Sequence, residues 1–246
     1  MAHTLAVREW VTGLLARCPS DCPLCRSRAN GGLLCPACTH ELGRAMQAAV
    51  PRCPCCCLVL DAKGICHDCS RIAPAYDRII AAFDYAFPGN LLIHQFKQQR
   101  RFVSAKMLSA LLWHQIRLAQ FGLANDTILL PVPASRASLK LRGFNPAGEL
   151  ARSLGRRLGL RCRTDVLFRH RETGQQKYLG RQQRASALVG LYGCHGSVSG
   201  WRVALVDDVM TTGSTLNSLA VLLKEAGAVS VCGLVLARTP LRERAN

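Results

Sequence analysis

Eight cysteines in the first part of the chain are spaced as two copies of one metal-binding pattern. Each copy reads C-x2-C-x9-C-x2-C, and the second copy repeats the first after 31 residues. Two residues between thiolates let one tight turn present both sulfurs to one ion, and two such turns complete the tetrahedron that zinc prefers. The candidate ligands are Cys22, Cys25, Cys35, Cys38, Cys53, Cys56, Cys66 and Cys69.

Structural zinc, with two ions expected, is the interpretation that this spacing favours. Four thiolates close the coordination shell and leave no position for water, so a structural role fits better than a catalytic one. Disulfides, inert thiols and an iron–sulfur cluster are the alternatives. The ligands could pair within each copy or across the two copies. Cys18, Cys55 and Cys57 are surplus to the pattern, and Cys55 could compete with Cys56 for the ion.

A second group of residues able to do chemistry lies near the C-terminus. Adjacent carboxylates, Asp207 and Asp208, follow a continuous apolar run at 203–206 that is typical of a strand buried on both faces. A small hydroxyl-rich turn and an apolar-faced helix come next, so backbone N–H groups and the helix dipole would converge on an anion. Because carboxylates there could accept hydrogen bonds from sugar hydroxyls, the pattern indicates a ribose phosphate as ligand. The turn consists of Thr211, Thr212, Gly213, Ser214 and Thr215.

A third candidate is a basic segment between a predicted strand and a predicted helix. Residues 127–133 indicate an apolar strand that runs into a loop at 134–144. Asn145 then suits an N-cap, with proline at the first position of a helix over 146–158. The cations of the loop could contact a pyrophosphate, or they could form a solvated rim. They are Arg136, Lys140 and Arg142.

The elements that must position these residues follow from the apolar patterning. Strands and helices alternate through the second part of the chain, which predicts an α/β fold with a parallel sheet. The cysteine-rich part has few large apolar side chains and could hardly fold without metal. We therefore expect a small cysteine-rich module at 1–75 and an α/β domain at 78–246. Gly31–Gly32 and Lys63–Gly64 would turn the two cysteine hairpins.

Composition and charge narrow the classes of function. The chain has 246 residues, of which 49% are hydrophobic and 19% charged, so a core is possible and wholesale disorder is excluded. Lys and Arg outnumber acids by 32 to 15, and segment 134–186 alone has thirteen against three. This balance favours a polyanionic partner: nucleic acid, an anionic membrane surface or a phosphorylated metabolite. No apolar run is long enough to span a membrane and no secretory signal is found, which predicts a cytoplasmic protein.

Residues 203–215 resemble the signature of type I phosphoribosyltransferases. In that signature four apolar residues, two acids, a short apolar stretch (here 209–210) and a T-x-G-x-T type turn follow one another. The resemblance implies that Asp207 and Asp208 hold the ribose 2′- and 3′-hydroxyls of phosphoribosyl pyrophosphate. It also implies that 211–215 cradle the 5′-phosphate and that Mg²⁺ binds with the pyrophosphate.

Nearly the whole chain is similar to the ComF/GntX family. The block at 141–147, Leu-Arg-Gly-Phe-Asn-Pro-Ala, resembles the R-G-F-N-Q-A of the family, with Pro146 in place of the usual Gln. The blocks at 92–97 and 173–179, Arg184 and the cysteine-rich head agree with it. Members are linked to natural competence and to the use of external DNA as a nutrient. The resemblance implies a type I phosphoribosyltransferase-like parallel sheet flanked by helices, preceded by a small zinc-ribbon module.

Two functions are compatible with these features. The chain could be a phosphoribosyltransferase linked to DNA uptake or utilisation, with Asp207 and Asp208 at its catalytic centre. The segment 170–184 could then close over the site and bring Lys177 or Arg181 to it, or it could be an ordinary basic surface loop. The alternative is a nucleic-acid-binding protein of DNA uptake, with single-stranded DNA or the uptake machinery as partner, that keeps the fold without catalysis.

Overall fold

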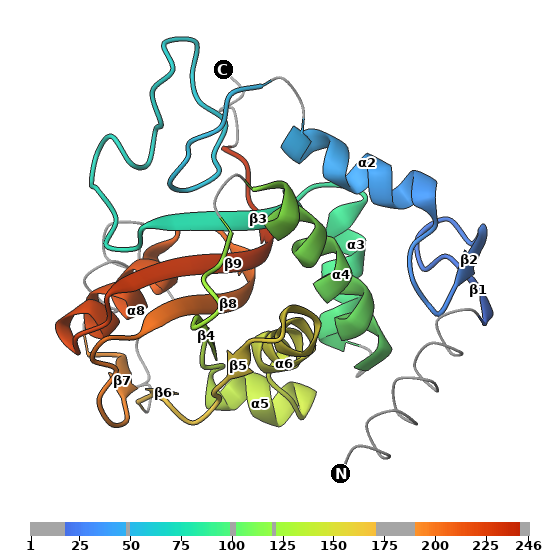
Figure 1. Cartoon of the computed structure of the whole chain (residues 1–246). Coiled ribbons are helices and arrows are strands. Elements are labelled where there is room, and N and C mark those ends of the chain that lie inside the picture. The colour runs from blue at the N-terminus through green and yellow to red at the C-terminus, as the bar shows by residue number, and fades with distance from the viewer. Residues whose placement is uncertain (1–17, 48–49, 99–101, 120–121, 171–189, 242–246) are drawn as a thin grey trace.

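A five-stranded parallel sheet forms the centre of the protein, in the order β3-β9-β8-β4-β5 (Figure 1). It confirms the expected parallel sheet. The structure is a computed structural model that describes residues 18–47, 50–98, 102–119, 122–170 and 190–241. The strands of the sheet are β3 (Arg78–Asp84), β4 (Ile128–Pro131), β5 (Arg161–Cys162), β8 (Arg202–Met210) and β9 (Ser230–Arg238).

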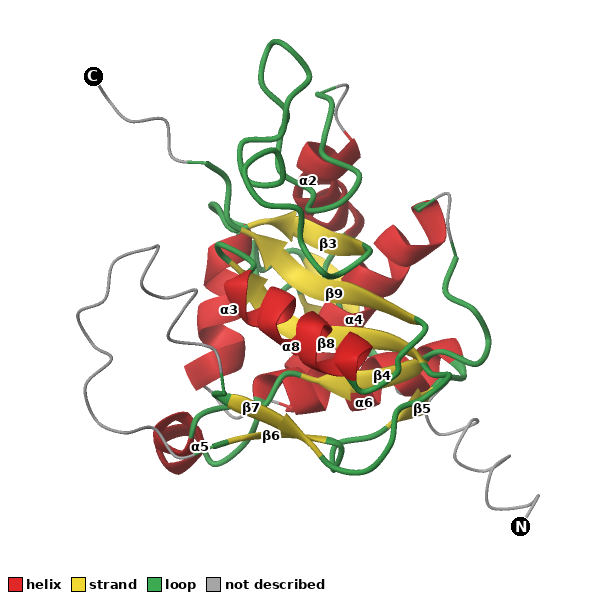
Figure 2. Ribbon diagram, turned by 90° about the vertical axis from the view of Figure 1, so that its left-hand side faces the viewer, coloured by secondary structure: helices red, strands yellow, loops and turns green. Residues whose placement is uncertain are grey.

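Helices cover both faces of this sheet (Figure 2). The helices α4 (Phe102–Leu118) and α6 (Pro146–Leu158) lie on one face, and α8 (Ser214–Glu225) lies on the other. Alternate residues of β8 point to opposite faces. Ala204 and Val206 join the core beneath α4 and α6, and Val203 and Leu205 join the core beneath α8. None of the described helices combines the length and the apolar character that crossing a membrane requires.

The helix after the basic segment starts and ends as its sequence indicates. The Asn145 side chain accepts a hydrogen bond from the Ala147 N–H, Pro146 occupies the first turn, and Gly159 ends the helix with φ 69°. Leu150, Ala151 and Leu154 form its buried face. Local capping chemistry therefore suffices to define α6.

The segment before α6 differs from its expected loop. Most of it forms a short helix, α5 (Arg136–Arg142), between an N-cap at Ser135 and a left-handed Gly143 with φ 78°. The Ser135 side chain accepts a hydrogen bond from the Ser138 N–H at 3.1 Å. Because α5 buries none of its residues, it has no apolar periodicity by which the sequence could reveal it.

The strand that carries the two acids is longer than its apolar run. It was expected to end at Val206, yet β8 continues to Met210, with Asp207 opposite Val235 of β9. The neighbouring strand explains the extension, because β9 runs equally far and the Thr239 N–H donates to the Met210 carbonyl at 2.9 Å. The acids therefore lie inside the last part of the strand rather than after it.

The first cysteine unit is built on a hairpin and a helix. The strands β1 (Pro19–Asp21) and β2 (Arg28–Asn30) are antiparallel, and their connection carries Cys22 and Cys25. Gly31–Gly32 were expected at this turn but lie after β2, because the Cys22 N–H to Ser27 carbonyl bond of 2.8 Å already closes the hairpin. Cys35 and Cys38 lie at the start of α2 (Pro36–Gln47).

The second cysteine unit is mostly turns. A single antiparallel bridge joins Arg52 to Val59. Gly64 has φ 73° in a turn that its N–H closes on the Asp61 carbonyl at 2.9 Å. This turn is the one expected at Lys63–Gly64.

The eight cysteines form two clusters able to hold a metal ion. The four sulfurs of each cluster lie within 4.8 Å of one another, and every cluster takes its members from one copy of the repeat. The distance between sulfurs is 3.6 Å for Cys25 and Cys35 and 3.4 Å for Cys56 and Cys66. A tetrahedral zinc ion separates its sulfurs by about 3.8 Å, whereas a disulfide needs about 2.05 Å. The geometry of each site thus fits a zinc ion, and the ligands of each site come from one copy of the repeat.

The two clusters pack against opposite faces of the sheet. Cys22 and Cys35 are buried in the core that contains Phe83, on the side of α4 and α6. Cys53, Cys56 and Cys66 are buried in the core beneath α8. Both units therefore contact the α/β part closely, and the division into modules at 1–75 and 78–246 stays a prediction.

Protein purified without chelator should contain about two zinc ions per chain, since each cluster offers a closed set of four thiolates. The change Cys22→Ser should remove one ion and unfold the first unit locally, while β3 to β9 stay folded. Metal analysis and hydrogen exchange measure these effects. The matched control is Cys194→Ser, outside both clusters, which should keep both ions. An absence of zinc from the parent protein would contradict this prediction.

Candidate functional site

A cavity of about 210 Å³ lies where the carboxyl ends of β4 and β8 meet. Carboxyl ends of neighbouring parallel strands are the common ligand position in open α/β sheets. The cavity brings together four residues that the sequence singled out from separate segments. They are Arg142, Asp207, Asp208 and Thr215.

Other expected site residues lie outside the lining of this cavity. Thr211, Thr212, Gly213 and Ser214 lead from β8 into α8 and complete the turn to which Thr215 belongs. Arg136 and Lys140 are exposed on α5 and do not line the cavity. Lys177 and Arg181 fall outside the described residues.

The turn after β8 has the backbone geometry of an anion cradle. Gly213 has φ 77° and lies directly before α8, so it provides no side-chain cap for the first helical N–H groups. The left-handed φ favours glycine here, and an added Cβ atom would also lie 2.5 Å from Met210 Cε and 3.2 Å from the Tyr76 hydroxyl. The hydroxyls of Thr212 and Ser214 are 2.8 Å apart. The Ser214 N–H reaches the Thr212 hydroxyl only at a long 3.4 Å, and N–H groups at a helix start with nearby hydroxyls are the donors that a phosphate requires.

The two acids differ in their surroundings. Asp208 forms an ion pair with Lys97, with 3.0 Å between Oδ2 and Nζ. Asp207 instead accepts the Asp208 backbone N–H at 2.8 Å. Burial, and then the negative charge of Asp208, raise the pKa of Asp207 to about 8, against the opposing effect of the Lys97 charge. Asp207 therefore holds its proton more tightly than an ordinary carboxyl group does.

The cavity also contains residues that the sequence did not single out for the site. Lys97 comes from the last turn of α3 (Gly89–Gln98), within the block at 92–97 that resembles the family. Arg169 and Tyr192 come from a separate antiparallel pair, β6 (Leu167–Arg169) and β7 (Tyr192–Cys194). The Asn145 amide donates to the Val132 carbonyl at 3.0 Å and ties the start of α6 to the end of β4. Only the family blocks could have indicated Lys97 and Asn145, and no sequence signal marks Arg169.

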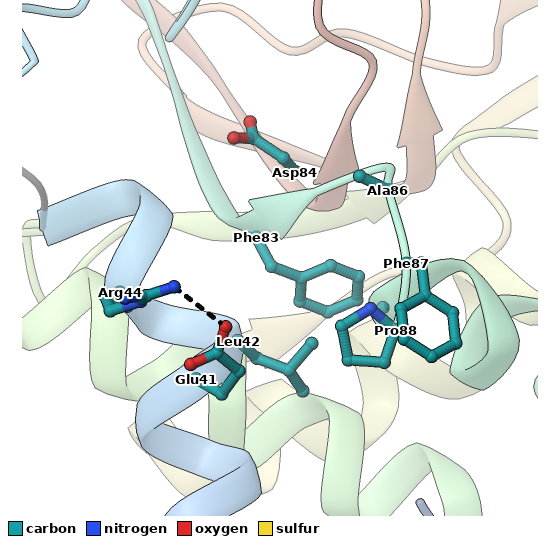
Figure 3. Close-up of a pocket in the computed structure, with 9 residues that line it drawn as sticks. Glu41, Leu42, Arg44, Phe83, Asp84, Ala86, Phe87 and Pro88 are labelled. Atoms are coloured by element: carbon teal, nitrogen blue, oxygen red, sulfur yellow. Dashed lines mark hydrogen bonds and ion pairs between the residues drawn. The ribbon is translucent and has the colours of Figure 1, made fainter.

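A larger hollow of about 440 Å³ lies between α2 and the connection from β3 to α3 (Figure 3). The ion pair between Glu41 and Arg44 at 3.1 Å lies on one side of it, and the rings of Phe83, Phe87 and Pro88 also line it. It contains none of the acids, hydroxyls or cations expected to bind a ribose phosphate. Despite its smaller size, the cavity beside Asp207 is therefore the candidate site.

A family model and two relatives match this chain in sequence. A family model described as phosphoribosyl transferase domain matches residues 137–245. The DNA utilization protein YhgH of Salmonella typhi is 32% identical over 227 residues, which cover 90% of this chain and 98% of that protein. Competence protein F of Haemophilus influenzae is 32% identical over 179 residues, or 70% of this chain and 78% of that protein.

Among solved structures, a purine phosphoribosyltransferase from Pyrococcus horikoshii matches with a TM-score of 0.32 and 22% identity, over 53% of this chain and 70% of that one. The similarity to YhgH covers 90% of the chain, so it includes both the cysteine-rich part and the parallel sheet. The chain therefore belongs to the ComF family of competence and DNA utilisation proteins, with a phosphoribosyl transferase domain in its C-terminal part.

Proposed function

We propose that the cavity beside Asp207 binds phosphoribosyl pyrophosphate and that the protein is a cytoplasmic phosphoribosyltransferase linked to DNA uptake or utilisation. The observation that carries this proposal is the meeting of Arg142, Asp207, Asp208 and Thr215 in one cavity. Membership of the ComF family supports both phosphoribosyl chemistry and the link to DNA.

The ligand would lie across three groups of residues. Asp207 and Asp208 would accept hydrogen bonds from the ribose hydroxyls, and 211–215 would hold the 5′-phosphate at the start of α8. The pyrophosphate would face the cations of the cavity wall, which are Lys97, Arg142 and Arg169. Arg136 and Lys140 extend this positive charge along α5. Magnesium, an oxygen-binding cation, would neutralise part of the pyrophosphate charge when bound.

The proposed reaction transfers the ribosyl group from pyrophosphate to a nucleophile. The bond between the anomeric carbon and a pyrophosphate oxygen breaks, the pyrophosphate departs with the electron pair, and the nucleophile forms the new bond. Positive charge grows on the ribose while negative charge grows on the leaving oxygen. The acids fix the ribose by its hydroxyls, and Lys97 and Arg142 stabilise the departing pyrophosphate, so this chain contributes positioning and electrostatics.

Binding of single-stranded DNA is a second candidate function, favoured by the α4–α6 surface. The guanidinium groups of Arg117 and Arg157 lie 4.9 and 5.6 Å from the Trp113 ring centroid. Apart from this surface, Arg163 lies 6.0 Å from the ring centroid of Trp201, which packs against the core beneath α8. Aromatic residues do not alternate with the basic run in the sequence, but the fold brings these tryptophans to it. Paired guanidinium and indole planes suit a nucleic acid, because they offer both charge and stacking.

The double change Asp207→Ala with Asp208→Ala should weaken binding of phosphoribosyl pyrophosphate by a few kcal/mol. Each charge-assisted hydrogen bond to a ribose hydroxyl is worth roughly 1.5–3 kcal/mol. Isothermal titration in the presence of magnesium measures the change. Glu225→Ala, at an exposed acid at the end of α8, is the control and should bind as the parent does. Equal affinity of the double variant and the parent would place the ligand elsewhere.

Affinity for ribose 5-phosphate should rise about tenfold between pH 7 and pH 9. With a pKa of about 8, Asp207 is mostly protonated at the lower pH and mostly ionised at the upper, and only the ionised form accepts two hydroxyl hydrogen bonds. The ligand phosphate, with its second pKa near 6, keeps its charge over this range. Titration at fixed magnesium gives the profile, which Asp207→Asn should flatten. A parent profile without a rise would show that ionised Asp207 does not bind the sugar.

Reversal of Arg156, Arg157 and Arg161 to Glu should flatten the salt dependence of DNA binding. Each phosphate that a cation neutralises in single-stranded DNA adds a slope of about −0.7 to log affinity against log salt. Fluorescence anisotropy of a labelled oligonucleotide measures the slope, and binding of phosphoribosyl pyrophosphate should stay nearly intact.

Two outcomes would contradict a separate nucleic-acid surface. Failure of the parent to bind DNA even at low salt would remove this second function. Equal loss of both ligands in the triple variant would mean that DNA phosphates occupy the site of the metabolite.

A further inference from the structure

One buried arginine connects the second cysteine cluster to the phosphate-binding turn. Arg238 ends β9, and its side chain is 1% exposed. Its Nε donates to the Cys56 carbonyl at 3.0 Å, and its Nη2 lies 3.1 Å from Asp68 Oδ2. Cys56 is a member of the cluster, and Asp68 lies between two further members, Cys66 and Cys69. One side of the guanidinium is therefore held by the cysteine unit.

The remaining nitrogen of the same guanidinium holds the backbone at the end of β8. Nη1 donates to the carbonyls of Met210 at 3.4 Å, of Thr239 at 3.0 Å and of Thr211. Met210 is the last residue of β8, and Thr211 is the first residue of the turn. In a planar trans peptide the carbonyl and the next N–H point in opposite directions. The bond from Arg238 to the Thr211 carbonyl thus directs the Thr212 N–H away from the arginine.

The connection from the cluster to β3 also contacts this turn. The Ala75 N–H donates to Asn217 Oδ1, in the first part of α8, at 2.7 Å. The Tyr76 hydroxyl lies against Gly213, where an added Cβ would meet it at 3.2 Å. The first cluster offers a natural comparison, because Cys22 and Cys35 pack into the core on the other face of the sheet.

The position of Arg238 depends on order in the cysteine unit. A metal ion would fix Cys56, Cys66 and Cys69, and with them the Cys56 carbonyl and the Asp68 side chain. Without the ion, the guanidinium would lose the groups that compensate its buried charge on that side. An uncompensated buried charge is strongly unfavourable, so Arg238 would move and release the carbonyls of Met210 and Thr211.

We propose that metal in the second cluster sets the affinity of the 211–215 turn for phosphate, with Arg238 as the positioning residue that couples the two sites. The inference rests on the proposed function of the turn. Because coupling between two binding sites is reciprocal, a bound phosphate ligand also raises the affinity of the second cluster for its metal. We expect an effect of about tenfold, within the usual range of roughly 5- to 150-fold.

The first test compares the two clusters in the full chain. Cys69→Ser should cost one zinc ion and weaken binding of phosphoribosyl pyrophosphate about tenfold. Cys38→Ser, the matched change in the first cluster, should also cost one ion but leave this affinity unchanged. Metal analysis and isothermal titration on the same preparations give both values. Equal effects of the two changes, or no effect of Cys69→Ser, would overturn the proposal.

The second test keeps all eight cysteines. Asp68→Asn removes the charge that faces Arg238, so it should weaken ligand binding several-fold while both zinc ions stay bound. In the parent, phosphoribosyl pyrophosphate should shift the equilibrium of one zinc ion between the protein and a chelator toward the protein, and in Asp68→Asn it should not. Full affinity and unchanged protection of the metal in this variant would show that Arg238 does not couple the sites.

Hydrogen exchange separates failure of the coupling from failure of the proposed function. Amides of 211–215 should exchange faster in Cys69→Ser than in Cys38→Ser, and this measurement needs no ligand. Unchanged exchange in Cys69→Ser would overturn the coupling. If exchange responds as expected but the parent binds no phosphoribosyl pyrophosphate, the proposed function is wrong and the structural link between cluster and turn stands.

Discussion

Parallel hydrogen bonding between β4 and β8 is the interaction on which the candidate site depends. Pro131 lies opposite Val206, and the Val132 N–H donates to the Val206 carbonyl at 2.9 Å. The basic segment therefore leaves β4 beside the two acids. Both strands are covered by helices, so their buried backbone groups must pair and a shift of register would bury unpaired ones. The relative position of cations and acids is thus set by the backbone ladder rather than by their own attraction.

The predictable parts of the fold are those with local signals. The capping pair at Asn145 and Pro146 defines α6, and the apolar runs of β4 and β9 mark strands buried on both faces. The helix α5 has no buried residue and so no pattern, and the length of β8 depends on its neighbour β9. Contacts between segments that are far apart in the sequence could not be predicted either. The ion pair of Lys97 with Asp208 exists only because α3 ends over the strand that carries the acid.

The two cysteine repeats have the same spacing but lie in different surroundings. The spacing indicates the eight ligands but leaves their pairing open, and it does not predict that the clusters lie on opposite faces of the sheet. The surplus thiols of the second unit also have a structural explanation. Cys55 and Cys57 point to the backbone of the connection and of β3, with Sγ of Cys57 2.9 Å from the Ile79 carbonyl. These two cysteines hold the second unit against β3 rather than compete for its metal ion.

This docking has a consequence for the solubility of the chain. The strand β3 is the outermost strand of the sheet next to β9, and an uncovered edge strand is a template for pairing with other molecules. The Ile79 N–H donates to the Cys55 carbonyl at 2.7 Å, so the cysteine unit occupies the free side of this strand. A chain made without metal would leave that edge open to intermolecular β-pairing. Metal binding to this unit would therefore keep the edge of β3 covered and limit such pairing.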